Sequence, residues 1–598
     1  MLKNNLVLSS RSDYLSSEHN NIFFNDKVFY ETDEKLTKKI KYTIPKDTLN
    51  EREERIRSFQ YCEEIYNSII KDLTINLNQI NKVEWGVQSW SIILGGWLRR
   101  FIYIIFYRYN TLKNILSKYE ITNVYLANSE TNHLTSHESV FIHDLSINDE
   151  WNSILFSKIF QYIQTDQKVE KKFINIDKKD FYEKKSFYES VNENRSTLNK
   201  IIYKLFSILK IFSSKKDGLI ISSYLPTVEE KKLELLFFQI PKFFEVKKIN
   251  YKKIDFSLRK NLNISKNCEI IEKIVRDQIS TYLPTFVLEN FEEVLTKSKQ
   301  MGYPSNPKFI FTSNSFEHDE LFKFYVADIK NTNEKVKYFI GQHGGFYLTR
   351  IDNNYANEVL TCDYFLSWGQ KKFNHVKTIP LFNFKLPKKI KNKKEQKYIT
   401  LIFRSLGYQC IPYNRFSEGK KEFLLAKNFI NKLPNNLKDL IYLRFHRTYY
   451  TDNLGHNQRH KNFLKQFISD VNCSKNFKYE NYEKVIEQSK IVCFCYESSG
   501  FLENITAQIP SISLYPNIFN PINEDCKIYY QDLKNAKIIF EDEKELILHL
   551  QNIWPDVDTW WKSNKVQNVI KKIITQFSDN PKANFLRDMK YKITEKLN

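Results

Sequence analysis

Apolar residues follow two different periods along this chain. Over residues 48–118 and 146–212 they recur at the spacing of amphipathic helices, so both segments are predicted to be mainly helical. From about residue 217, short apolar runs alternate with helical segments, which is typical of parallel sheets covered on both faces. Residues 1–47 resemble a lead-in with one or two small strands, and 123–127 are a further candidate strand.

The alternation of strands and helices divides into two series. The first predicts strands at 218–224, 308–313, 335–340 and 364–368, with helices at 229–238, 269–299 and 319–329. The second predicts strands at 398–403, 440–445, 491–495, 511–514 and 537–540, with helices from about 543. A lysine- and proline-rich stretch separates the series and predicts a linker at 385–396, because like charges disfavour a packed core.

The pattern therefore predicts an α/β protein with two Rossmann-like, doubly wound domains. The first domain would span 1–384 and include the N-terminal helical segments, and the second would span 397–598 and include the terminal helices. Ligands bind at the carboxyl edges of such sheets, so a cleft between two of these edges is the expected place for a site.

Three of only 13 glycines fall in Gly341-Gln342-His343-Gly344-Gly345, directly after a predicted strand. A glycine-rich loop with a histidine at its tip brings backbone N–H groups and a titratable side chain to a ligand. The alternative is a tight turn with a surface histidine. Asp352, Glu358 and Asp363 lie downstream, and each is a candidate to act as base or to orient His343.

Two polar clusters follow strands of the second series. Ser498, Ser499 and Gly500 lie where a strand turns into a helix, a setting that suits a phosphate, and Glu503 in the same helix suits ribose hydroxyls. The alternative is ordinary N-capping by serine, with Glu503 complementing the helix dipole. Arg444, His446 and Arg447 end another strand and suit an anionic ligand, unless they form only a solvated basic strand end.

Two weaker clusters complete the candidate set. Arg404, Ser405 and Gly407 follow the strand at 398–403, as a further backbone approach to a ligand or as a plain loop. Ser313 and Asn314 follow the strand at 308–312, where they would bind acceptor hydroxyls or, with better odds, cap the next helix.

Composition narrows the function classes. The formal charge of +21 permits a nucleic-acid partner, but the lysines are scattered and Asn, Ile, Phe and Tyr are abundant as well, which favours AT-rich coding bias. The apolar segment 90–107 is interrupted by Arg99 and Arg100, well short of about 20 residues, so it predicts a buried or partly interfacial helix. Eight cysteines without a CxxC pair indicate a reducing compartment and no structural metal, and the N-terminus lacks an apolar leader.

An ordered set of short motifs carries a family resemblance over about residues 85–595. The set comprises Gln88-Ser-Trp90, Gly96-Trp-Leu98, Asp149-Glu-Trp-Asn152, Gln239-Ile-Pro241, Phe311-Thr-Ser-Asn314, Gly341–Gly345, Ser367-Trp-Gly369, Leu502-Glu503 before Ile509-Pro510, and Asp556-Val557 before Trp560-Trp561. It resembles the transferases encoded in O-antigen and surface-polysaccharide gene clusters. The resemblance implies a two-Rossmann, GT-B-type glycosyltransferase.

A weaker likeness concerns the donor. Bacterial sialyl- and Kdo-type transferases place a His-Pro motif and a Ser-Ser motif on the CMP part of their donor; here Ser498-Ser499 fits, but His446 is followed by Arg447. Gly500 also stands where threonine is expected. The likeness therefore implies a nucleotide-sugar donor, with a CMP-linked ulosonic acid as one candidate.

Together these observations predict a metal-independent glycosyltransferase without a cofactor. His343 would be the base or a donor-binding group, and the acceptor would be a cell-surface polysaccharide, an O-antigen or a lipid-linked glycan. We expect a cytoplasmic protein, with peripheral contact to the inner face of the cytoplasmic membrane favoured by its basic charge. The alternatives are transfer of a polyol phosphate from a CDP-polyol by the same fold and, least favoured, nucleic-acid binding.

Overall fold

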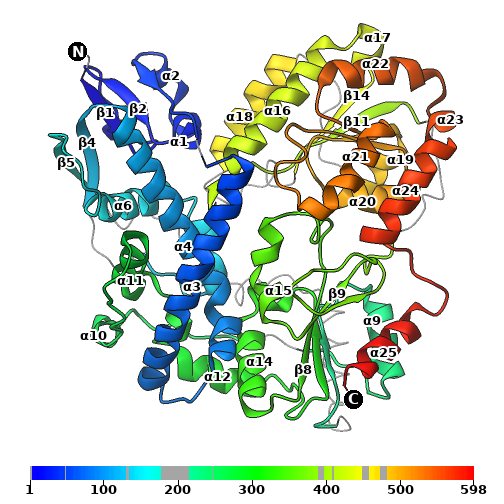
Figure 1. Ribbon diagram of the computed structural model, residues 1–598, viewed down its shortest axis with the longest axis horizontal. Helices are drawn as coiled ribbons and strands as arrows, with labels where there is room; N and C mark the ends of the chain where they lie inside the picture. The colour runs from blue at the N-terminus through cyan, green and yellow to red at the C-terminus, as the bar shows by residue number, and fades with distance from the viewer. Residues whose placement is uncertain are drawn as a thin grey trace.

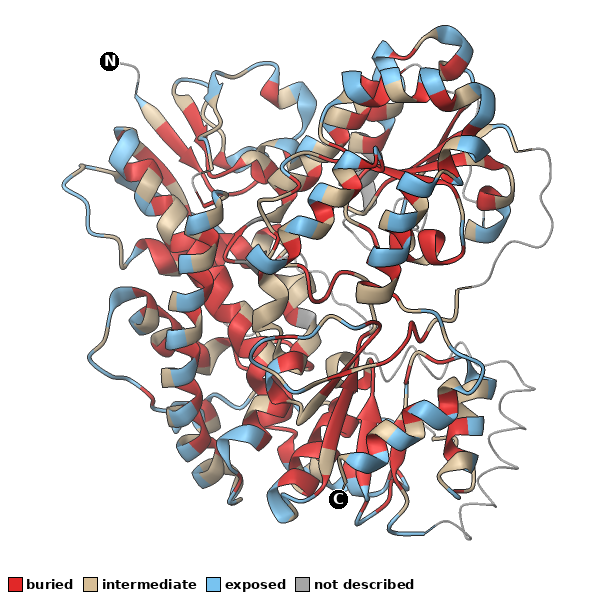
Figure 2. Ribbon diagram, turned by 45° about the vertical axis from the view of Figure 1, so that its right-hand side comes forward, coloured by how far each residue is buried: buried red, intermediate tan, exposed pale blue. Residues whose placement is uncertain are grey.

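The computed structural model describes residues 3–47, 49–128, 134–176, 214–244, 247–387, 396–406, 410–446, 457–471 and 481–597. These residues form three five-stranded parallel sheets, which lie at the upper left, lower right and upper right of Figure 1. We call them the N-terminal, middle and C-terminal sheets. In the middle and C-terminal sheets the strands are mostly buried, with helices outside them, whereas the edge strand of the N-terminal sheet at residues 170–175 is largely exposed (Figure 2).

The C-terminal sheet confirms the second strand series. Its strands are β11 (Tyr398–Ile402), β14 (Ile441–Arg444), β15 (Ser489–Phe494), β16 (Ser511–Leu514) and β17 (Ile539–Phe540), in the order β14-β11-β15-β16-β17. Helices that cover this sheet include α16 (Arg415–Lys432), α20 (Ser499–Thr506), α22 (Glu543–Ile553) and α24 (Asn564–Phe577). The strand order reverses direction between β11 and β15, so the ligand crevice of this sheet is expected at the carboxyl ends of these two strands.

The middle sheet confirms the first series, with strands slightly shorter than predicted. It contains β6 (Leu219–Ile221), β7 (Phe309–Thr312), β8 (Lys337–Gly341), β9 (Tyr364–Ser367) and β10 (Thr378–Pro380), laid side by side in sequence order. Helices α9 (Thr227–Leu236), α11 (Ile270–Tyr282), α12 (Phe291–Lys299), α14 (Glu320–Thr332) and α15 (Asn357–Thr361) follow its strands. The last helix, α25 (Phe585–Glu595), returns from the C-terminal part and adds Leu586, Met589 and Ile593 to the middle core.

The N-terminal sheet corrects the interpretation of residues 1–47 as a lead-in. It is built from β1 (Asn4–Val7), β2 (Asn20–Phe23), β3 (Tyr42–Thr43), β4 (Ile121–Asn128) and β5 (Glu170–Asn175), in the order β3-β2-β1-β4-β5. Strand β4 confirms the candidate strand at 123–127, and β1 and β2 match the small strands expected in residues 1–47. The sequence pattern does not show that these strands form one sheet, because asparagines replace apolar residues in them. Asn5 and Asn21 are fully buried, and the amides of Asn123, Asn5 and Asn21 hydrogen-bond one another at 3.0 Å across adjacent strands.

Two long helices join the N-terminal and middle sheets. They are α3 (Arg52–Asn81) and α4 (Val87–Lys118), as the helical prediction for 48–118 requires. Helix α4 is buried on most of its surface, including residues 97–99 and 101–109, so the apolar segment is a core helix. In the described parts of the chain, no helix is long and apolar enough to cross a membrane.

Two other predictions concern segments that lie partly outside the described residues. Of the predicted helical segment 146–212, α6 (Asp149–Phe160) is a helix and β5 is a strand, while 177–213 lie outside the described residues. Most of the predicted linker, residues 388–395, lies outside them as well. The two domain boundaries remain predictions.

Asp149 anchors the end of β1 to the start of α6. Its Oδ2 accepts hydrogen bonds from Ser9 Oγ at 2.6 Å and from Ser10 N and Ser10 Oγ at 3.0 Å, and all three residues are buried. The motif Asp149-Glu-Trp-Asn152 therefore has a structural role, because the Asp149 carboxylate accepts the hydrogen bonds that the loop after the central strand β1 donates.

We expect Asp149→Ala to lower the free energy of unfolding by about 2–3 kcal/mol, because it removes a buried charged acceptor and leaves its donors unpaired. Urea denaturation measures the change. Asp13→Ala is the matched control, since Asp13 forms only a surface ion pair with Arg11, and it should cost at most about 1 kcal/mol. Equal costs for the two variants would contradict the anchoring role.

Candidate active site

The glycine loop begins where β8 ends, and contacts with buried residues of the middle part hold it in place. A side chain at Gly341 would collide with Ser313 and Phe384, at 2.3 and 2.7 Å, so only glycine fits there. Gln342 is buried; its amide donates to Gly344 O at 2.7 Å, and its Oε1 accepts from Trp368 N at 3.0 Å. These contacts hold the loop in one shape and leave His343 at its tip.

The loop touches the start of helix α20 in the C-terminal part. Gly345 N donates to Ser499 Oγ at 2.7 Å, and a Cβ at Gly345 would lie 2.9 Å from Ser499 Cα. Phe346 follows with a φ of 62° and packs in the core of the C-terminal part, beside Phe501. The structure thus brings two predicted motifs, the glycine loop and the serine pair, into direct contact.

His343 lies in an aromatic and acidic setting. Tyr347 Oη lies 3.0 Å from His343 Nδ1 and 3.2 Å from Nε2, and it donates to Glu358 Oε1 at 2.7 Å. Rings of Tyr224 and Phe316 flank the imidazole. Burial lowers the pKa of His343 below its ordinary value of 6.5, against the raising effect of Glu358. The imidazole is therefore neutral near pH 7 and able to accept a proton.

A second carboxylate faces the same imidazole. Burial alone would raise the pKa of Glu317, but Arg100 and the nearby imidazoles of His318, His143 and His343 lower it to about 2. Glu317 is therefore ionised at neutral pH and accepts hydrogen bonds without taking up a proton. His343 is the better candidate for proton transfer.

Cavity A, of about 390 Å³, lies between the loop and the C-terminal sheet. Its wall includes Arg404 after β11 and Ser499 after β15, so it opens at the crevice that the strand order predicts. Gly345, Tyr347 and Asp352 line it from the middle part, and Arg55 lines it from α3. All three parts of the fold contribute to this one cavity.

Charges of both signs line cavity A. The guanidinium of Arg350 bonds Asp352 at 3.0 Å and Glu497 at 2.9 Å, while Arg404 pairs with Glu422 at 2.8 Å. Burial raises the pKa of Glu422 to about 7 against the opposing effect of Arg404. Arg415 adds a further, half-buried cation, whose pKa is lowered by desolvation and by Arg350 and Arg404. An anion in cavity A would meet several guanidinium groups at once.

Cavity B, of about 510 Å³, lies against α4. Its wall includes Trp97, Arg100, Glu317, His343 and Glu358. Tyr347, Asp352, Asn353 and Arg415 line both cavities, so the two are neighbours separated by a shared wall. His343 lines cavity B, and Tyr347, 3.0 Å from its Nδ1, lies in the wall that the two cavities of ligand size share.

The other predicted residues lie elsewhere. Among the described residues, Arg444, His446, Ser498 and Glu503 are outside the walls of both cavities. Arg444 stacks on the Tyr482 ring at 5.0 Å, Ser498 caps α20 by accepting from Gly500 N at 3.1 Å, and Glu503 pairs with Lys385 at 2.7 Å.

The remaining predicted binding residues are Ser313, Asn314 and Arg447. Ser313 is fully buried and donates to Ser223 O at 2.8 Å, whereas Asn314 begins α13 (Ser315–His318) without a side-chain cap bond. Arg447 lies outside the described residues.

Sequence reasoning missed several residues of the two cavities. Tyr347 and Arg350 follow His343 closely in the sequence, so a prediction that extended the glycine loop by a few residues would include them. Arg415, Glu418 and Glu422 recur at intervals of three and four, which places them on one face of α16, and that spacing was an available signal. Glu497 directly precedes the serine pair.

Comparison with known proteins gives one family assignment. The family described as LIC12162 family transferase matches residues 4–593. No curated protein sequence matches. Among solved structures, the chain is similar to the spinosyn rhamnosyltransferase SpnG complexed with spinosyn aglycone, at 10% identity, 48% coverage of this chain, 78% of that chain and a TM-score of 0.26. It is also similar to MurG of Acinetobacter baumannii, at 11% identity, 61% and 88% coverage and a TM-score of 0.30.

Proposed function

The chain belongs to the LIC12162 family of transferases, and from that premise we propose that it is a GT-B-type glycosyltransferase. It would move a sugar from a nucleotide-sugar donor to a hydroxyl of a glycan acceptor. The observation that carries the proposal is the position of His343, a half-buried imidazole in the wall of cavity B, whose hydrogen-bonding neighbour Tyr347 lines cavity A as well.

Cavity A is the proposed donor site. Arg404, Ser499 and the first N–H groups of α20 would contact the phosphates, since a helix start and guanidinium groups both favour anions. Gly344 and Gly345 allow the close approach, and Gly341, Gln342 and Ser313 fix the loop. Ser498 would support the helix start.

The remaining predicted binding residues keep a secondary place in the proposal. Arg444, His446 and Arg447, near the end of β14, would contact a more distant part of the donor. Glu503 would reach ribose hydroxyls only if its ion pair with Lys385 opened.

His343 is the proposed general base. It would take the proton as the acceptor O–H bond breaks, while the acceptor oxygen bonds to the anomeric carbon and the bond from that carbon to phosphate oxygen breaks. Glu358, through Tyr347, would stabilise the resulting imidazolium. Asp352, paired with Arg350, would hold the phosphate-side cations in place. These guanidinium groups would supply the charge that makes a metal unnecessary.

Thermal unfolding with a panel of nucleotides tests the donor site. A nucleotide that binds only the folded chain should stabilise it by about 2.7 kcal/mol at a concentration of 100 Kd. CMP as the only stabilising nucleotide would favour an ulosonic-acid donor or the alternative polyol-phosphate transfer, and product mass separates these because the latter leaves a phosphodiester. No stabilisation by any nucleotide would contradict the proposal.

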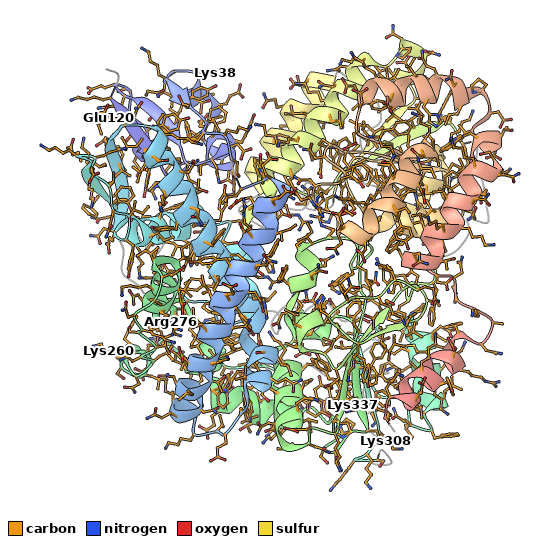
Figure 3. The ribbon with its side chains drawn as sticks, in the orientation of Figure 1. Lys38, Glu120, Lys260, Arg276, Lys308 and Lys337 are labelled. Atoms are coloured by element: carbon orange, nitrogen blue, oxygen red, sulfur yellow. The ribbon has the colours of Figure 1, made fainter. Side chains whose placement is uncertain are left out.

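The acceptor and the cellular setting are also proposed. A surface polysaccharide, O-antigen or lipid-linked glycan is the expected acceptor, made available at the inner face of the cytoplasmic membrane. The labelled lysines Lys38, Lys260 and Lys308 lie at separate places on the molecule (Figure 3), which speaks for general attraction to anionic lipid over a single nucleic-acid groove.

A further inference from the structure

We propose that cavity B binds an uncharged, polyhydroxylated sugar unit of the acceptor, and that Glu317 accepts hydrogen bonds from its hydroxyl groups. This inference rests on the proposed glycosyl transfer and adds the chemical class of the acceptor unit. Three features of the cavity carry it: a carboxylate with incomplete bonding, cations that already have partners, and a partly apolar wall.

Glu317 has capacity for further hydrogen bonds. Its Oε1 lies 3.4 Å from Arg100 Nη2 and 3.9 Å from His143 Nε2, and its Oε2 lies 3.4 Å from His318 Nε2. Charge-assisted hydrogen bonds are normally about 2.7–2.9 Å long. A carboxylate offers about four acceptor positions, so Glu317 can accept from two hydroxyl groups of a ligand in cavity B.

Two cations in the wall of cavity B already have close partners. Arg99 donates to Glu63 at 2.9 and 2.6 Å and to Asn357 at 2.6 Å. Lys323 donates to Ser139 at 2.6 Å and pairs with Glu320 at 2.9 Å. Arg100 and Arg415 also line the cavity, but so do the carboxylates of Asp352 and Glu358. Together with Glu317, these carboxylates would repel a phosphate or carboxylate, which disfavours an anionic ligand.

Part of the wall is apolar. Ile92, Ile93 and Trp97 of α4 and Phe316 of α13 line the cavity beside its polar residues. A wall that combines apolar and polar side chains matches a pyranose, which has apolar C–H faces and a rim of hydroxyls. His343 lies in the same wall and would meet the reacting hydroxyl.

Titration of the purified full-length chain with methyl glycosides, followed by saturation-transfer NMR, tests the inference. The panel contains neutral hexosides, a methyl glycosiduronate and a hexose phosphate. We expect at least one neutral hexoside to bind, and Glu317→Gln to weaken that binding about tenfold to a hundredfold, as for lost hydrogen bonds to a charged group. Binding of the anionic probes alone, or of no probe, would overturn the proposal.

Two controls separate a local effect from misfolding and from failure of the proposed function. Glu292→Gln, the same substitution at an exposed position of α12, should leave hexoside binding unchanged. Glu524→Gln, at an exposed position of the C-terminal part, should also leave it unchanged. Hexoside binding that depends on Glu317 without any sugar transfer from a nucleotide donor would support the site and refute the glycosyltransferase. Nucleotide-dependent transfer with undiminished hexoside binding in Glu317→Gln would refute the site alone.

Discussion

His343→Ala is expected to lower kcat by about a hundredfold to ten-thousandfold, the usual contribution of a positioned general base. The imidazole lies in the wall of cavity B, and burial lowers its pKa, so it is neutral at physiological pH. Its loss would leave the acceptor hydroxyl without a group to take its proton. Sugar transfer measured at saturating donor and acceptor gives the change in kcat.

The pH profile distinguishes a base from a binding residue. A base must be neutral to act, so kcat should fall as pH decreases through the pKa of His343, which lies below 6.5. Glu358→Gln removes a charge that raises this pKa, so the acidic limb should move to still lower pH. Unchanged nucleotide-induced stabilisation in His343→Ala would show that the donor site is intact. An unaltered kcat in that variant would remove His343 from the mechanism.

The sequence predicted the parts of the fold whose strands are continuous apolar runs. Strands β7, β8, β11 and β15 are covered on both faces, so their sequences are mostly apolar and easily recognised. The N-terminal sheet has buried asparagines that satisfy one another across strands, and such pairs become visible only when the strands are placed side by side. Local pattern does not contain this information.

For the candidate site, too, the sequence predicts some residues and misses others. The glycine loop and the serine pair were recognisable because each follows a strand, and strand ends converge at a sheet edge. Other contacts of the site depend on how the chain folds after those motifs, which the sequence alone does not show. They are the link from His343 through Tyr347 to Glu358 and the pair of Arg350 with Glu497. The same reasoning predicts Arg444 and Glu503 as ligand-binding residues, but their side chains contact Tyr482 and Lys385, respectively.

The pair of Arg350 and Glu497 joins the glycine-loop segment to the C-terminal sheet. Their side chains are 13% and 7% exposed and meet at 2.9 Å, and Tyr530 Oη also donates to Glu497. Around them, Ile351 N donates to Pro521 O at 2.9 Å and Asn523 N donates to Thr349 O at 2.7 Å. The pair is therefore a buried part of the contact that encloses cavity A.

We expect Glu497→Gln to lower the free energy of unfolding by about 3 kcal/mol, because removing one partner leaves a buried guanidinium less compensated. The cost stays near the low end of the range for buried pairs, since Asp352 still bonds Arg350. Urea denaturation measures it. Glu524→Gln is the matched control: Glu524 also lies in the C-terminal part and pairs with an arginine of another part, Arg52 of α3, but it is 76% exposed, so its loss should cost no more than about 1 kcal/mol.

A double-mutant cycle with Arg350→Met then assigns the effect to this pair. If the two side chains stabilise each other, the combined variant should lose less free energy than the sum of the single variants, with a coupling of about 0.5–3 kcal/mol. Nucleotide-induced stabilisation should fall in the same variants, because the pair forms part of the wall of cavity A. Additive losses, or costs equal to that of Glu524→Gln, would mean that this contact does not hold the two parts together, and the closed arrangement around cavity A would then depend on the backbone bonds and on Phe346.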